Sequence, residues 1–150
     1  MSQAKGIREV GYFDCAGGGQ VVVADGFAYL GHIDDPHGTT IVDVRDPKHP
    51  AVVAEFGMPA GTHSHKVRVG NGMMIVNHEI LDERQAGDYR GGLGIYDVST
   101  PQKPREIVRW ETPGKGVHRF DFDGDYVYCS PTAEGYVGNI MMILDVREPA

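Results

Sequence analysis

One short pattern occurs three times in this sequence, and it limits the possible folds more than any other feature. Each copy reads Ile-x-Asp-Val and leads into a proline-bounded turn. The copies begin at Ile41, Ile95 and Ile143. They are about fifty residues apart, a period typical of the four-stranded blades of a β-propeller. We therefore expect an all-β fold.

Apolar runs between these copies predict the other strands of each unit. Counting from the centre of a propeller outwards as A to D, the strands follow in the order D-A-B-C. Outer D strands are expected at residues 8–14, 51–57 and 105–111, and innermost A strands at residues 20–24, 65–69 and 118–122. B strands are expected at residues 27–31, 73–77 and 126–130, after the tight turns Asp25-Gly26, Asn71-Gly72 and Asp123-Gly124.

The three predicted units cover residues 7–50, 51–104 and 105–150 of a single domain, residues 1–150. Propellers usually close with four to eight blades. Three units therefore predict a partial propeller. Either the remaining blades belong to a longer chain, which we favour, or copies of the chain associate to close the ring.

The pattern Ile41-Val-Asp-Val-Arg-Asp-Pro-Lys-His-Pro50, preceded by Asp25-Gly-Phe-Ala-Tyr-Leu30, resembles the LVIVD repeat family of β-propellers. The same features recur as Asp123-Gly-Asp-Tyr-Val-Tyr128 and Ile143-Leu-Asp-Val146. This resemblance implies the propeller fold. It implies no particular activity, because one architecture serves many functions.

Charge and hydropathy narrow the classes of partner. The formal net charge is −7, and no cluster of Lys and Arg in the sequence compensates it, which disfavours nucleic acid. No apolar run is long enough to span a membrane, and Met1 to Gly11 lacks the hydrophobic stretch of a signal peptide. Cys15 and Cys129 show neither disulfide nor metal spacing. We expect a cytoplasmic protein that binds a small molecule or another protein.

Aspartate recurs at the same place in every unit, at Asp43, Asp97 and Asp145. A residue repeated in this way, before loops that otherwise differ, indicates a structural role. We expect each carboxylate to accept a hydrogen bond from the turn that follows.

Histidines mark the candidate site. His65 and His118 begin successive A strands, where side chains point towards the mouth of the central channel, and Gln20 is expected at the same position in the first unit. His63 lies two residues before His65, so both point the same way in an extended chain. A long polar loop is expected at residues 77–91, and its Glu79, Asp82 and Glu83 could supply a carboxylate. The favoured alternative is that this loop is only a solvated excursion.

One imidazole from each blade can assemble a site for a transition metal such as iron or copper. The arrangement is similar to that of methanethiol oxidases, the selenium-binding protein family, whose propellers hold copper through histidines near the channel, and carotenoid oxygenases hold iron in a comparable way. The alternative is structural hydrogen bonding by His65 and His118.

Two functions remain open from the sequence. The first is a scaffold whose loop face binds a ligand or partner, with residues 77–91 as the contact. The second is part of a metal-dependent enzyme, in the oxidoreductase class, with a cluster of His63, His65 and His118. The fold and the repeat family favour the scaffold.

Overall fold

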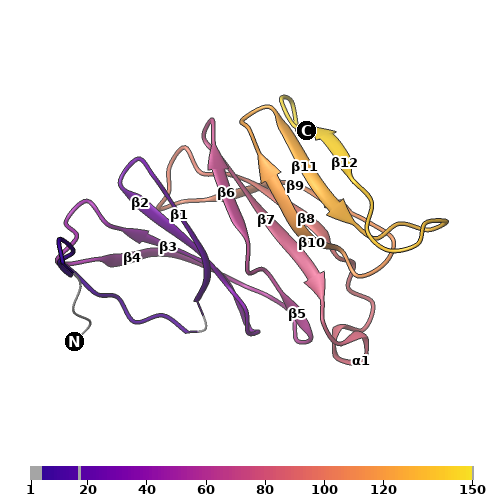
Figure 1. Ribbon diagram of the computed structural model, residues 1–150, viewed down its shortest axis with the longest axis horizontal. Coiled ribbons are helices and arrows are strands. Elements are labelled where there is room, and N and C mark those ends of the chain that lie inside the picture. Colours follow the sequence, from indigo (N-terminus) through magenta and orange to yellow (C-terminus); the bar gives the residue numbers. More distant parts are fainter. Residues whose placement is uncertain (1–4, 17, 150) are drawn as a thin grey trace.

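The computed structural model describes residues 5–16 and 18–149. Three antiparallel sheets lie side by side from the N-terminal to the C-terminal end (Figure 1). This arrangement confirms the all-β prediction and is consistent with a β-propeller-like fold. Among the described residues, no helix combines the length and hydrophobicity that a membrane span requires.

Each sheet is a meander that follows the chain. The first sheet contains β1 (Gly18–Ala24), β2 (Phe27–His32), β3 (His37–Asp43) and β4 (Ala51–Gly57). The second contains β6 (Val67–Gly70), β7 (Met73–Ile80), β8 (Gly92–Asp97) and β9 (Arg105–Glu111), with β5 (Thr62–His63) also paired to β7. The third contains β10 (Val117–Phe122), β11 (Tyr126–Pro131) and β12 (Met142–Asp145).

Apolar side chains fill the two spaces between neighbouring sheets. Tyr29 and Ile41 of the first sheet pack with Met74 and Val76 of the second. A separate cluster joins the second and third sheets, and it includes Ile75, Leu93, Phe120 and Val127. Burial of these faces stabilises the stacking of the sheets, because it removes apolar surface from water.

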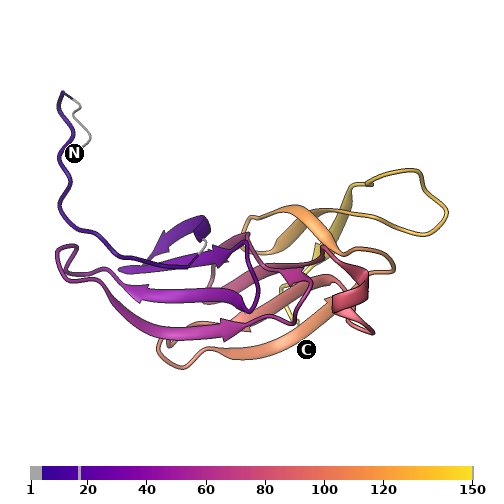
Figure 2. The same cartoon turned by 90° about the horizontal axis from the view of Figure 1, so that it is seen from below.

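The first predicted outer strand is absent. Residues 8–14 form no strand and are mostly exposed. Gly11 lies against the backbone of Pro47 in the turn before β4, and the N-terminal end of the segment extends away from the sheets (Figure 2). A strand needs a partner for its backbone groups, and none of the sheets described here offers one to this segment. The structure therefore groups the strands as A-B-C-D, A-B-C-D and A-B-C.

The long loop is also shorter than predicted. Strand β7 continues to Ile80, so Asn77 and Glu79 lie in a regular strand. The loop that follows contains the short helix α1 (Glu83–Ala86). The side chain of Asp82 caps this helix by accepting a hydrogen bond from the backbone N–H of Arg84 at 2.9 Å.

The repeated aspartates act as predicted. Asp43, Asp97 and Asp145 each accept a hydrogen bond from the backbone N–H two residues later, at 3.0–3.1 Å.

The first two hairpins also turn at the predicted residues, with positive φ at Asp25-Gly26 and Asn71-Gly72. The third turns one residue later than predicted, because Phe122 pairs with Val127.

A β-bulge interrupts each innermost strand at the same place. In the first sheet, the register shifts between Gly18 and Val21, and in the third between Val117 and Phe120. In the second sheet, one extra residue separates the pairing of β5 from that of β6. Bulges re-aim side chains and occur often beside functional sites.

Candidate metal centre

The register of the sheets decides which residues are equivalent. Val21, Val67 and Phe120 pair with matching positions of β2, β7 and β11. The residues two positions before them are therefore Gly19, His65 and His118. The predicted match of His65 with His118 agrees with this register.

The prediction for the first unit was wrong, since Gly19 and not Gln20 is equivalent to His65. A Cβ atom at Gly19 would lie only 2.8 Å from the backbone oxygen of His65 and 3.1 Å from its Cβ. The backbone of the link before β6 fills this space, because the N–H of Gln20 donates to the same His65 oxygen at 2.9 Å. The bulges were not visible in the sequence, so counting from the strand starts misplaced Gln20.

The structure brings the three predicted histidines together. One ring nitrogen from each of His63, His65 and His118 lies within 4.8 Å of the others. The ring centroids of His63 and His65 are 4.1 Å apart, and those of His65 and His118 are 5.2 Å apart. Strand β5 supplies His63, the link before β6 supplies His65 and β10 supplies His118, so the cluster joins the second and third sheets.

Glu79 connects two of these rings. Its Oε2 lies 2.7 Å from Nε2 of His63 and 2.7 Å from Nδ1 of His118. Burial alone would raise the pKa of Glu79, but the hydrogen bonds from both histidines outweigh it and lower this pKa to about 2. Glu79 is therefore an ionised carboxylate at neutral pH.

An ionised carboxylate can only accept hydrogen bonds, so both contacting nitrogens must carry hydrogen. In a neutral imidazole the other ring nitrogen then carries a lone pair. In the neutral form of each ring, this lone pair is on Nδ1 of His63 and on Nε2 of His118. Nδ1 of His63 is buried and has no hydrogen-bond partner among the described residues.

His65 completes the cluster as a neutral ring. Burial is the main cause that lowers the pKa of His65 to about 4, and the nearby His63, Lys66 and His118 act in the same direction. The ring contacts Asn77 only at a long distance, 3.5 Å from its Nδ1 to the side-chain nitrogen. It is thus deprotonated at neutral pH, the form that a metal ion requires.

One side of the cluster is open to solvent. The side chain of His63 is only 8% exposed, whereas that of His118 is 41% exposed. Three nitrogen donors with one accessible side are the arrangement of metal sites that keep a coordination position for water or substrate.

The other two carboxylates of the predicted loop, and the histidines outside the cluster, lie elsewhere. Glu83 is exposed in α1, and Asp82 is occupied as the helix cap.

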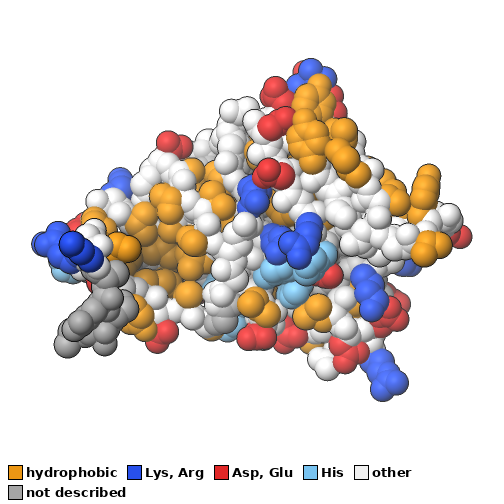
Figure 3. Space-filling model, viewed as in Figure 1, with side chains coloured by type: hydrophobic (Ala, Val, Ile, Leu, Met, Phe, Trp, Pro, Cys, Tyr) orange, Lys and Arg blue, Asp and Glu red, His pale blue; other side chains and the backbone are white. Residues whose placement is uncertain are grey.

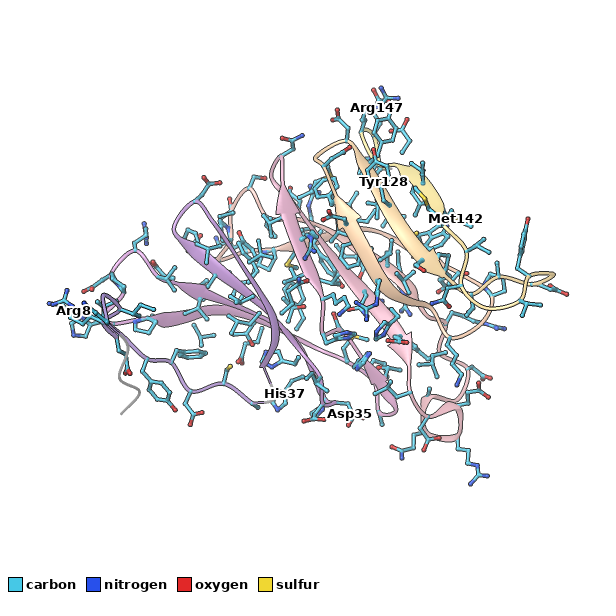
Figure 4. All side chains as sticks on the ribbon, viewed as in Figure 1. Arg8, Asp35, His37, Tyr128, Met142 and Arg147 are labelled. Atoms are coloured by element: carbon cyan, nitrogen blue, oxygen red, sulfur yellow. The ribbon has the colours of Figure 1, made fainter. Side chains whose placement is uncertain are left out.

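His37, labelled in Figure 4 beside Asp35 at one end of the first sheet, is exposed. His32 and His78 are buried at equivalent positions inside their sheets. Burial is also the cause that raises the pKa of the Cys129 thiol to about 11, as expected of an inert cysteine.

Comparison with known proteins identifies the repeat. Residues 18–56 match the family model of the LVIVD repeat, and this segment runs from β1 into β4. The predicted family resemblance is confirmed for this unit. No curated protein and no solved structure gave a significant match.

Proposed function

Taking the chain as an LVIVD-repeat protein with a propeller-like fold, we propose that it binds one transition metal ion through His63, His65 and His118. Imidazole nitrogens suit zinc, copper, iron and nickel. The open side of the cluster would leave a coordination position for a substrate. The proposal therefore extends to a metal-dependent enzyme of the oxidoreductase class.

The observation that carries this proposal is the hydrogen-bond pattern of His63. Its Nε2 is held by Glu79, while its buried Nδ1 has no partner among the described residues. A buried polar atom without a partner costs about 1–3 kcal/mol. A metal ion at Nδ1 would remove this cost. A carboxylate on the opposite nitrogen is the usual support of a metal-bound histidine.

Metal titration of the full chain tests the proposal. Metal-free protein is titrated with Co²⁺, Zn²⁺ and Cu²⁺, with stoichiometry from elemental analysis and affinity from calorimetry. We expect one equivalent of at least one of these ions in the wild type. The triple variant His63→Gln, His65→Gln, His118→Gln should lose it.

The matched control carries His37→Gln and His49→Gln, two exposed histidines outside the cluster. It should bind like the wild type. Glu79→Gln keeps the three rings but removes the charged acceptor of His63 and His118, so the metal affinity should fall about 10–100-fold. Absence of stoichiometric metal in the wild type, or unchanged binding in a folded triple variant, would refute the proposal.

The scaffold function stays a prediction. If the loop at residues 81–91 is the contact, replacing it should abolish partner binding and leave metal affinity unchanged. Measuring both partner binding and metal affinity therefore separates the scaffold function from the metal-binding function.

A further inference from the structure

A second row of side chains lies next to the histidine row. This second row consists of the residues that directly follow Gly19, His65 and His118 in the three bulges. They are Gln20, Lys66 and Arg119. Strand β6 contacts both β1 and β10, so the row continues across all three sheets. In Figure 3 a group of Lys and Arg side chains lies directly against a group of His side chains near the middle of this face.

These residues line an open pocket of about 430 Å³. Its polar part includes Gln20, Lys66 and Arg119. Phe120 and Met141 contribute apolar walls. A pocket that combines a few converging polar groups with apolar walls is typical of small-molecule sites.

Arg68 also lines this pocket, but its charge is already compensated. Its Nε donates to Asp121 Oδ1 at 2.7 Å, and its Nη1 donates to Gln20 Oε1 at 2.6 Å. Arg68 therefore holds the pocket wall in place and orients Gln20.

Lys66 and Arg119 are different, because neither forms an ion pair within residues 5–16 and 18–149. The whole chain has a formal net charge of −7, yet these two cations line one pocket without a carboxylate partner. Like charges that share a site repel each other. A bound anion would convert this repulsion into attraction.

We propose that Lys66 and Arg119 bind the carboxylate of a small organic acid whose apolar part lies against Phe120 and Met141. The planar guanidinium of arginine matches a carboxylate with two parallel hydrogen bonds, and the lysine ammonium adds a compact positive charge. Because the two cations directly follow His65 and His118, the carboxylate binds beside the metal centre. Its assignment as the substrate of that centre rests on the proposed function, whereas anion binding itself does not.

Metal-free protein tests the anion site independently of the metal. The probe is benzoate, with benzamide as a neutral analogue of the same shape, and binding is followed by calorimetry and by amide chemical shifts. We expect saturable benzoate binding that shifts the amides of Lys66, Arg119 and Phe120. Benzamide should bind at least tenfold more weakly.

The variant Lys66→Gln, Arg119→Gln should weaken benzoate binding at least tenfold. Lys103→Gln, Arg84→Gln removes the same charges at exposed positions outside the pocket and should bind like the wild type. Equal binding of benzoate and benzamide, no benzoate binding, or unchanged affinity in the pocket variant would overturn the proposal. If the wild-type protein binds benzoate but no metal ion, only the proposed metal centre is refuted.

Discussion

At the scale of single residues, two equivalent histidines show how one neighbour changes the chemistry of a buried ring. His32 of the first sheet lies 2.8 Å from the hydroxyl of Thr40. In the second sheet, Gly94 occupies the position equivalent to Thr40. A Cβ atom at Gly94 would lie only 3.0 Å from Nε2 of His78. His78 therefore has no such hydroxyl partner, and its buried Nδ1 is unpaired among the described residues.

This environment predicts acid sensitivity. Burial, with Arg109 as a second cause, lowers the pKa of His78 from 6.5 to about 3. Between these values the unfolded chain binds a proton that the folded chain does not, so stability falls as pH decreases from about 6.5 towards 3. For this one group the slope is at most about 1.4 kcal/mol per pH unit.

Urea unfolding of metal-free protein at several pH values between 4 and 7 measures the effect. His78→Gln should flatten the dependence relative to the wild type, whereas His49→Gln, at an exposed position, should leave it unchanged. Parallel curves for the wild type and His78→Gln would show that burial of His78 does not disfavour its charged form.

At the scale of elements, Asn77 of β7 connects two innermost strands. Its Oδ1 accepts from the backbone N–H of Lys66 at 2.8 Å, and its Nδ2 donates to the backbone oxygen of Val117 at 3.0 Å. Asn77 is fully buried. This side chain therefore satisfies backbone groups at both bulges that present His65 and His118.

Asn77→Ala should destabilise the protein by about 2–4 kcal/mol, because it leaves two backbone groups without a partner in a buried position. Chemical denaturation measures this change. Asn139→Ala removes an exposed asparagine and should change stability by less than about 0.5 kcal/mol. If both substitutions have equal effects, Asn77 does not hold the two strands together.

Metal affinity of Asn77→Ala should also fall, because the bulges position two of the three histidines.

At the scale of the whole molecule, the outer faces of the first and third sheets carry exposed apolar side chains. Val21 and Val23 of β1 are 58% and 63% exposed, and Ile143 of β12 is 55% exposed. Figure 3 shows hydrophobic surface over the first sheet. Faces of this kind are typically covered by another sheet or by a partner.

We therefore expect the 150-residue chain to self-associate at micromolar concentration in sedimentation or light-scattering measurements. Val23→Thr with Ile143→Thr should reduce this association, since both changes keep a β-branched side chain and add a polar group. Leu81→Gln, which removes an exposed apolar side chain outside the strands, is the control. A monomer at all concentrations would show that these faces need no cover. Closure of a ring by further blades or a second copy stays a prediction.

Much of this architecture follows from the sequence because its signals are local. The Ile-x-Asp-Val pattern and the Asp25-Gly26 turn depend on residues within a few positions of each other, so periodicity and turn chemistry predicted most of the strands, but not the absence of a strand at residues 8–14. The match of His65 with His118 followed from the same repeat, and the expectation that His63 points the same way as His65 followed from their spacing of two residues.

Only the tertiary structure decided what surrounds these histidines. Glu79 was expected in a polar loop, yet continued pairing of β7 with β5 places it between His63 and His118. The bulges, which moved Gln20 out of the histidine row and set Lys66 beside Arg119, arise from pairing between strands. Strand register depends on contacts between residues far apart in the chain, and the local pattern of one strand does not contain it.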